Sequence, residues 1–173
     1  MNKKENISLI GMAGVGKTAL GKKLASYYRK KFIDIDDEIE NSEKRSINEI
    51  IQEDGDNYFI NIEEKITLKL DLSKPSIIAT GGSIVYSKKA MNFLKKQSII
   101  IFLNTSPIQI KNRLHNLEER GVIGIKNKPF EEIYKERLPL YQKYTDMVFT
   151  STHHPQSDDC LEKLISAIKL FTK

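Results

Sequence analysis

The chain alternates short runs of consecutive apolar residues with longer stretches in which apolar residues recur every three or four positions. The short runs are typical of strands buried on both faces, and the longer spacing is typical of helices with one buried face. Strands are accordingly predicted at residues 7–10, 32–37, 76–79, 99–103 and 147–150. Helices are predicted at about residues 18–31, 46–53, 59–70, 88–96, 107–117, 129–144 and 158–171.

Strands that alternate with helices in this way predict an α/β domain with a five-stranded parallel sheet, and one domain over residues 1–173 suits the length. Two helices between the second and third strands suggest an inserted helical segment at about residues 36–71. Residues 118–128 contain two glycines and several charges without a clear period. We expect a mobile lid at about residues 115–128, because such loops often close over bound ligands.

Composition narrows the class of protein. The chain has 39% hydrophobic and 29% charged residues, as globular proteins do, and no apolar run approaches the roughly 20 residues of a membrane span. Residues 1–5 lead straight into the first predicted strand without an apolar targeting segment. We therefore expect a cytoplasmic protein, without a membrane partner.

Charge and cysteine content exclude further classes. The formal net charge of +5 comes from scattered lysine pairs, so we expect no nucleic-acid partner, which would need a concentrated basic stripe. The single cysteine, Cys160, excludes an internal disulfide and a cysteine-based zinc cluster. We expect a monomer.

The strongest motif follows the first predicted strand. Residues 11–18 read Gly-x-x-x-x-Gly-Lys-Thr between a strand and a helix, which is the context of a phosphate-binding loop. We expect its lysine to reach the β- and γ-phosphates of ATP and its threonine hydroxyl to bind Mg²⁺. The expected nucleotide-binding residues here are Gly11, Ala13, Gly14, Val15, Gly16, Lys17, Thr18 and Ala19. The alternative, a glycine-rich turn that binds nothing, is disfavoured by the complete match.

Polar residues and glycines mark the ends of two other predicted strands. Asp34 and Asp36 end the second strand, and Gly81 and Gly82 follow the third. Doubly wound sheets bind ligands at the carboxyl ends of their strands, and consecutive glycines there indicate a close approach of backbone to ligand. We therefore expect these residues beside the phosphate-binding loop. The alternative for the two aspartates is a place on the surface at the strand end.

Across essentially the whole chain, in one register, the motifs resemble those of the shikimate kinase family, small P-loop kinases related to the nucleoside monophosphate kinases. Residues 32–36 resemble the family's aromatic-x-Asp-x-Asp segment, residues 79–83 its Ala-Thr-Gly-Gly-Gly segment, and residues 137–141 its Arg-x-Pro-Leu-Tyr segment. The resemblance implies a three-layer P-loop NTPase fold like that of the nucleoside monophosphate kinases, with an acceptor-binding helical insertion and a lid.

The resemblance also implies roles for single residues. Asp34 would help to hold Mg²⁺ through water, and Asp36 would bind hydroxyl groups of shikimate. The backbone amides of Gly81 and Gly82 would contact the acceptor and the γ-phosphate. Arg137 would bind the carboxylate of shikimate.

Two more arginines match positions of the family pattern. Arg113 would pack on adenine, and Arg120, in the predicted lid, would stabilise charge on the transferring phosphoryl group. From periodicity alone, Arg113 could instead be an exposed helical arginine.

The sequence departs from the family pattern at the predicted acceptor site. Ile60 stands where the family has a second carboxylate-binding arginine, and Ser83 replaces the third glycine. Isoleucine cannot hydrogen-bond an anion, and the lost bond would be worth about 1.5–3 kcal/mol, roughly ten- to a hundredfold in affinity or rate. The proline that follows the lid arginine in the family is also missing, because residue 121 is glycine.

The sequence therefore predicts an ATP-dependent kinase for a hydroxyl group of a small carboxylated metabolite, with shikimate as the leading acceptor. The expected catalytic residues are Lys17, Asp36 and Arg120, and the expected acceptor-binding residues include Ile60 as the altered position. Two alternatives stay open: a kinase of this kind with another acceptor, such as a sugar acid or hydroxy-amino acid, and a nucleotide-binding regulator without catalysis.

Overall fold

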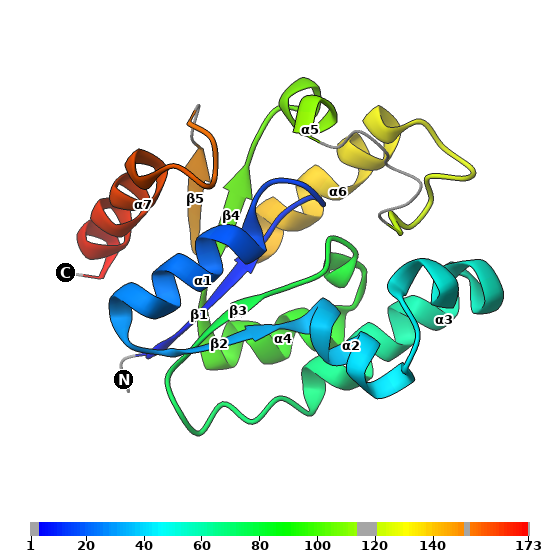
Figure 1. Cartoon of the computed structure of the whole chain (residues 1–173), viewed down its shortest axis with the longest axis horizontal. Coiled ribbons are helices and arrows are strands. Elements are labelled where there is room, and N and C mark those ends of the chain that lie inside the picture. Colours follow the sequence, from blue (N-terminus) through cyan, green and yellow to red (C-terminus); the bar gives the residue numbers. More distant parts are fainter. Residues whose placement is uncertain (1–3, 114–120, 151–152, 173) are drawn as a thin grey trace.

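A parallel sheet of five strands forms the centre of the molecule (Figure 1). The computed structural model describes residues 4–113, 121–150 and 153–172. From one edge of the sheet to the other, the strands are β2 (Lys31–Asp34), β3 (Ser76–Ala79), β1 (Asn6–Ile10), β4 (Ser98–Asn104) and β5 (Met147–Thr150). All neighbouring strands pair in parallel, which confirms the predicted α/β fold.

Helices cover both faces of this sheet (Figure 1). On one face lie α1 (Lys17–Tyr28) and α7 (Asp158–Phe171), which contact each other. On the other face lie α4 (Lys88–Gln97) and α6 (Phe130–Tyr144), both in contact with β4. The sheet and its two helical coverings form the three layers that the sequence predicts. No helix in the described ranges is long and apolar enough to cross a lipid bilayer.

The second predicted strand is shorter than expected, and a helix follows it at once. The sequence predicts a strand over residues 32–37, but β2 ends at Asp34, and α2 (Ile35–Glu43) begins at the next residue. Asp34 caps this helix, because its carboxylate accepts a 3.1 Å hydrogen bond from the backbone N–H of Asp36. The predicted strand end is therefore wrong, and Asp36 lies in the first turn of α2, where acidic residues favour the helix dipole.

A long helix, α3 (Ile47–Leu68), connects α2 to β3 and breaks at Gly55. Gly55 has φ 84° and ψ 170°, at the place where the sequence indicates a turn. Ser46 and Glu49 form a capping box at the start of the helix. The backbone N–H of Ser46 donates to the Glu49 carboxylate, and the backbone N–H of Glu49 donates to the Ser46 hydroxyl oxygen. The helices α2 and α3 lie where the sequence predicts a helical insertion, beyond the carboxyl end of β2 (Figure 1).

Two short helices complete the described elements. The 3₁₀ helix η1 (Ile84–Tyr86) follows β3, and α5 (Pro107–Arg113) follows β4. Pro107 is the first residue of α5, which is the position that tolerates proline best in a helix. Both helices therefore start near the carboxyl ends of central strands, where ligand sites form in such sheets.

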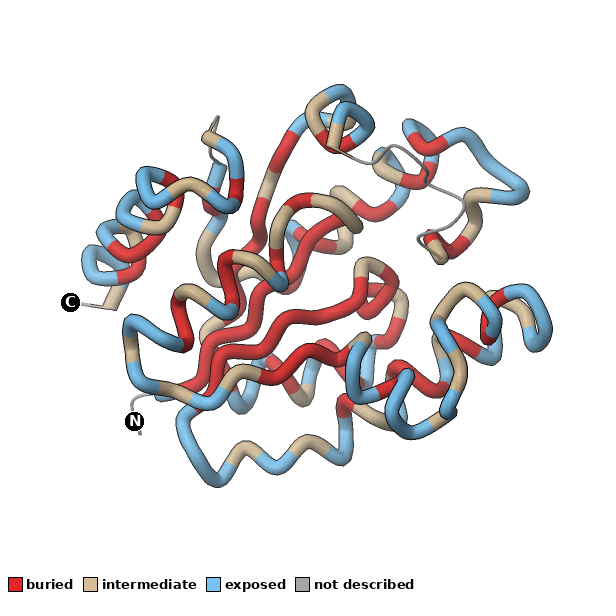
Figure 2. Tube along the Cα trace, in the orientation of Figure 1, coloured by how far each residue is buried: buried red, intermediate tan, exposed pale blue. Residues whose placement is uncertain are grey.

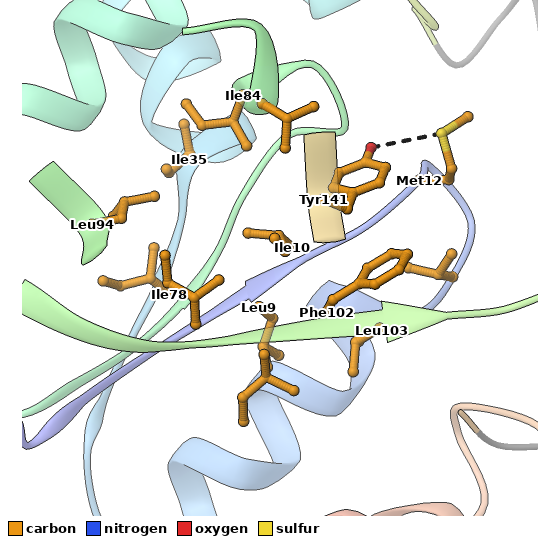
Figure 3. Close-up of a cluster of buried hydrophobic side chains, with 14 of the residues drawn as sticks. Leu9, Ile10, Met12, Ile35, Ile78, Ile84, Leu94, Phe102, Leu103 and Tyr141 are labelled. Atoms are coloured by element: carbon orange, nitrogen blue, oxygen red, sulfur yellow. Dashed lines mark hydrogen bonds between the residues drawn. The ribbon is translucent and has the colours of Figure 1, made fainter. Parts of the chain in front are cut away.

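The buried core follows the central strands and continues beneath the phosphate-binding loop, as the red part of the trace in Figure 2 shows. Phe102 of β4 stacks on Tyr141 of α6, with 4.9 Å between ring centroids (Figure 3). The hydroxyl of Tyr141 lies 3.6 Å from the sulfur of Met12 in the loop and donates a 2.5 Å hydrogen bond to the carbonyl oxygen of Gly82. The buried side chain of Tyr141 thus contacts both the phosphate-binding loop and the loop that contains Gly82.

Candidate active site

The phosphate-binding loop connects β1 to α1 and packs closely against its neighbours. Gly11 has φ 143°, and a Cβ atom there would lie 2.7 Å from the carbonyl oxygen of Leu103. Gly16 has φ 102°, and a Cβ atom there would overlap Pro155. Both backbone conformations favour glycine, and neither position has room for a side chain. The glycine spacing of the motif is therefore a requirement of this loop.

Lys17 begins α1, and its ammonium group turns back into the loop. Its Nζ donates hydrogen bonds to the carbonyl oxygens of Gly11 and Met12, both at 2.8 Å. Burial lowers the pKa of Lys17 to about 8, although the negative charge of Asp36 acts in the opposite direction. A phosphate group carries full negative charge where carbonyl groups offer only dipoles. Phosphate binding would therefore draw the ammonium group away from these carbonyls and stabilise its charged form.

Thr18 and Asp34 lie side by side next to the loop. The Thr18 hydroxyl donates a 2.8 Å hydrogen bond to Asp34 Oδ2, while Asp34 Oδ1 caps α2. Burial raises the pKa of Asp34. Hydroxyl and carboxylate oxygens, directly or through water, are the ligands that Mg²⁺ takes beside bound phosphates. This donor set fits the predicted magnesium ion.

An open cavity of about 480 Å³ extends outward from the phosphate-binding loop. Of the predicted nucleotide-binding residues, those that line it are Ala13, Gly14, Gly16, Lys17, Thr18, Ala19 and Arg113. Five lining residues had no predicted role, namely Lys22, Thr80, His154, Pro155 and Gln156. Because Arg113 reaches this cavity, its placement favours contact with a nucleotide over a purely solvent-exposed position. Val15 lies beneath, where it lines a smaller cavity together with Arg113.

A second, smaller cavity of about 40 Å³ meets the first at Ala13 and Asp36, which line both. The other residues that line this acceptor cavity are Ile47, Phe59, Gly81, Gly82, Ser83, Gly121, Val122, Ile123 and Arg137. A hydroxyl group held at Asp36 in the acceptor cavity would therefore face the terminal phosphate of a nucleotide in the larger cavity. The small volume also means that an acceptor ring can enter only if the lining segments move outward.

Asp36 projects toward the junction of the two cavities. Its Oδ1 is buried and has no hydrogen-bond partner among the residues that the structure describes. Burial raises the pKa of Asp36 to about 6, and the positive charge of Lys17 opposes this shift. Above that pH, Asp36 is a carboxylate that can accept a hydrogen bond or a proton from a hydroxyl group.

Arg137 reaches the acceptor cavity from α6 and is only 1% exposed. Its Nη2 donates a 2.8 Å hydrogen bond to the carbonyl oxygen of Ile123, and its Nε donates a 3.2 Å hydrogen bond to the hydroxyl of Tyr86. The guanidinium group also lies over the Tyr86 ring, 5.1 Å from its centroid. No salt bridge to Arg137 occurs in the described parts of the chain. Its charge is therefore available for an anionic acceptor.

The described end of the predicted lid, residues 121–128, packs on the helical insertion. Val122 and Ile123 are buried, and the backbone N–H of Gly124 donates a 3.0 Å hydrogen bond to Asp56 Oδ2. The remaining part of the predicted lid, with Arg120, lies outside the described residues. The role of Arg120 stays a prediction.

Ile60, the position where the family pattern has an arginine, is half-buried on α3 and packs against the hydrophobic core. Its neighbour Phe59 lines the acceptor cavity, whereas Ile60 is not among the described residues that do. Its influence on the acceptor stays a prediction.

Glu63 is a buried carboxyl group for which the sequence predicted no role. It is 1% exposed, and the hydroxyl of Ser83 donates a 2.7 Å hydrogen bond to its Oε2. Two adjacent glutamates on a helix look like a solvated surface. The signal that could have found Glu63 is its spacing of four residues from Phe59, which places both on the same buried face of α3.

The phosphate-binding loop follows the carboxyl end of the central strand β1, and the nucleotide and acceptor cavities both open on the carboxylate of Asp36. These features define this protein as a P-loop kinase. Comparisons with known proteins give its family. The shikimate kinase family model matches residues 13–169. A shikimate kinase from Thermodesulfovibrio yellowstonii is 34% identical over 163 residues, which cover 93% of each chain. A shikimate kinase from Dictyoglomus turgidum is 33% identical over 149 residues, which cover 84% of this chain and 87% of that one. The chain belongs to the shikimate kinase family.

Solved structures agree with this assignment. A shikimate kinase from Acinetobacter baumannii, solved in complex with shikimate, superposes with a TM-score of 0.84 at 27% sequence identity. The match covers 95% of this chain and 93% of that one. This chain thus has the fold of a solved family member over nearly its whole length.

Proposed function

We propose that this protein transfers the γ-phosphoryl group of ATP to a hydroxyl group of shikimate. One observation carries the proposal: the two cavities meet at Asp36, with Lys17 on the nucleotide side and Arg137 on the acceptor side. Family membership supports the reaction, and the likeness to the A. baumannii enzyme with bound shikimate supports the acceptor. The cytoplasmic location and the monomeric state stay predictions.

Arg137 would hold the carboxylate of the acceptor. A guanidinium group can donate two parallel hydrogen bonds to a carboxylate, and a buried arginine without a salt bridge gains most from such a partner. Nη2 carries two N–H groups, of which one donates to Ile123, and Nη1 carries two more. Because the acceptor cavity is small, acceptor binding would be coupled to an outward movement of the segment around Ile123, and closure behind the acceptor would exclude water.

Asp36 would orient the attacking hydroxyl group and accept its proton. Its pKa of about 6 leaves it ionised at neutral pH, yet close enough to neutrality to take a proton as the phosphoryl group is transferred. Lys17 would stabilise charge on the transferring group, together with Arg120. Thr18 and Asp34 would hold Mg²⁺, which supplies further neutralisation of phosphate charge when it is bound.

The test is ADP release from Mg·ATP with shikimate, run beside a panel of sugar acids and hydroxy-amino acids. We expect shikimate-dependent turnover that Lys17→Met abolishes. Turnover of another acceptor with none of shikimate would contradict the proposed acceptor. It would favour a kinase of this family that phosphorylates a different small hydroxylated acid. The absence of a second carboxylate-binding arginine at Ile60 is the observation that keeps this second candidate open.

A regulator that binds nucleotide without catalysis is the remaining alternative. It would bind ATP and release no ADP with any acceptor in the panel. The junction at Asp36 disfavours it, because a binding protein has no need for an ionisable carboxylate between two cavities.

A further inference from the structure

A chain of hydrogen bonds leads from the acceptor cavity to the outer surface of α6. Arg137 Nε donates a 3.2 Å hydrogen bond to the hydroxyl of Tyr86 in η1, and this hydroxyl donates a 2.7 Å hydrogen bond to Glu136 Oε1. The other carboxylate oxygen, Glu136 Oε2, lies 2.5 Å from Lys128 Nζ. Side chains from η1, from α6 and from the end of the predicted lid are thus joined in series.

The carboxylate of Glu136 fixes the direction of the Tyr86 hydroxyl. The hydrogen bond from Lys128 lowers the pKa of the Glu136 carboxyl group, and the bond from Tyr86 acts in the same direction. An ionised carboxylate only accepts hydrogen bonds, so the Tyr86 proton has to point toward Glu136. The lone pairs of the hydroxyl oxygen are then left for an N–H group, which Arg137 Nε supplies.

The aromatic ring of Tyr86 adds a second constraint on Arg137. The guanidinium carbon lies 5.1 Å from the ring centroid, which is within the range of a cation–π interaction. A hydrogen bond at Nε and a contact with the ring together restrict the rotation of the guanidinium group. A planar group that binds a carboxylate through two parallel hydrogen bonds depends on such a fixed orientation.

Arg137 supplies the positive charge of the acceptor cavity. Among the described residues that line this cavity, it is the only lysine or arginine. Its Nη1 faces Gly82, where a Cβ atom would lie 3.2 Å from it. Tyr86 is not one of those lining residues, so it would act on an acceptor through Arg137.

We propose that Tyr86 is a positioning residue for acceptor binding, which holds the guanidinium group of Arg137 in the orientation that binds a carboxylate. Glu136 in turn holds the hydroxyl of Tyr86. The inference rests on the proposed function, which gives Arg137 the carboxylate of the acceptor. It adds that the preference for a carboxylated acceptor depends on an aromatic hydroxyl group outside the cavity.

Tyr86→Phe tests the inference, because it removes the hydroxyl group and keeps the ring. Tyr134→Phe is the matched control: the Tyr134 hydroxyl also donates to a side-chain oxygen, Asn104 Oδ1 at 3.2 Å, but Tyr134 is outside the set of described residues that line the acceptor cavity. We expect Tyr86→Phe to raise the KM for shikimate about three- to tenfold, the usual effect of one lost hydrogen bond. The kcat and the KM for ATP should stay within about twofold, and Tyr134→Phe should behave like the wild type.

The same substitution in an Arg137→Met background separates positioning from a general structural role. Without the guanidinium group, Tyr86 has nothing to orient, so Tyr86→Phe should then change the KM for shikimate less than about twofold. A structural role would act equally in both backgrounds. The full effect in the Arg137→Met background, or no effect of Tyr86→Phe alone, would overturn the inference.

Glu136→Ala gives a second readout, whose sign distinguishes positioning from charge. By charge alone, the loss of a negative group next to Arg137 would lower the KM for an anionic acceptor. Positioning predicts a rise of about two- to fivefold, because the Tyr86 hydroxyl loses the partner that directs its proton. Glu132→Ala removes the same charge from an exposed position one turn earlier on α6 and should behave like the wild type. A KM that falls or stays the same in Glu136→Ala would overturn the inference.

Failure of the two proposals is distinguishable. No turnover of shikimate by the wild type contradicts the proposed function, whereas turnover that Tyr86→Phe leaves unchanged contradicts only this inference. If thermal unfolding shows that Tyr86→Phe does not fold, Glu136→Ala takes its place, because Glu136 is exposed and its loss leaves the core intact.

Discussion

Arg137 donates a 2.8 Å hydrogen bond from Nη2 to the carbonyl oxygen of Ile123, in the described end of the predicted lid. The bond links the buried arginine side chain that lines the acceptor cavity to a segment that must move when an acceptor enters. Tyr86 steadies the rest of the guanidinium group, since its hydroxyl accepts from Nε and donates to Glu136. The guanidinium group is therefore held in place before the acceptor binds, and it has further N–H groups for the acceptor carboxylate.

Arg137→Met should raise the KM for shikimate about ten- to a hundredfold, because one charge-assisted interaction is lost. The KM for ATP should change little, since Arg137 does not line the nucleotide cavity as far as the structure describes it. Steady-state kinetics with each substrate varied in turn provide the measurement. Lys135→Met, an exposed position on the same helix, is the control. Equal rises in both KM values would show that Arg137 has no special part in acceptor binding.

Asp36→Asn should lower kcat by about 10²–10⁴-fold, because the variant retains the shape of the side chain and loses the base. The pKa of Asp36 is raised to about 6, so its basic form is lost as the pH falls through that value. The wild-type kcat/KM for shikimate should therefore decline below about pH 6. A pH profile of the wild type checks this expectation, and an activity that stays constant down to pH 5 would speak against a base at this position.

The lowered pKa of Lys17 predicts a loss of activity at high pH. Its pKa is lowered from 10.5 to about 8, so the charged form that binds phosphate is lost as the pH rises through about 8. The kcat/KM for ATP should fall above that pH, because this ratio reports on the enzyme before ATP binds. Kinetics at a saturating shikimate concentration measure the effect. A flat profile up to pH 10 would mean that the ammonium group keeps its charge before ATP binds.

Ile60→Arg should lower the KM for shikimate about tenfold, because a charge-assisted hydrogen bond is worth roughly 1.5–3 kcal/mol. Residue 60 stands three positions before Glu63 on α3, so an arginine there starts on the same side of the helix. Asn61→Arg adds the same charge at an exposed neighbouring position and serves as the control. If both variants resemble the wild type, the acceptor site does not extend to residue 60.

Much of the fold could be predicted from the sequence because the strands are continuous apolar runs. The runs at residues 76–79 and 147–150 coincide with β3 and β5. The whole of α2 was missed, because residues 34–38 at its start are mostly acidic and look like a polar strand end. The cap at Asp34, which turns that acidic segment into a helix start, depends on one backbone hydrogen bond to Asp36.

The phosphate-binding loop and the carboxylates beside it could be predicted because short sequence motifs define them. The glycine spacing and the positions of Lys17 and Asp36 are local features, which a motif records. No role was predicted for Glu63, although its spacing from Phe59 indicates burial, because its contacts with the distant residues Ser83 and Gly81 appear only in the fold. The substitution at Ser83 was visible in the sequence, but only the fold shows that its hydroxyl bonds to Glu63.

The most direct test of the central claim is the mass of the acceptor after incubation with Mg·ATP. The account predicts that shikimate gains one phosphoryl group, in an amount equal to the ADP formed, with the wild type and not with Lys17→Met. ATP binding by the folded wild type with no phosphorylated shikimate would contradict the account.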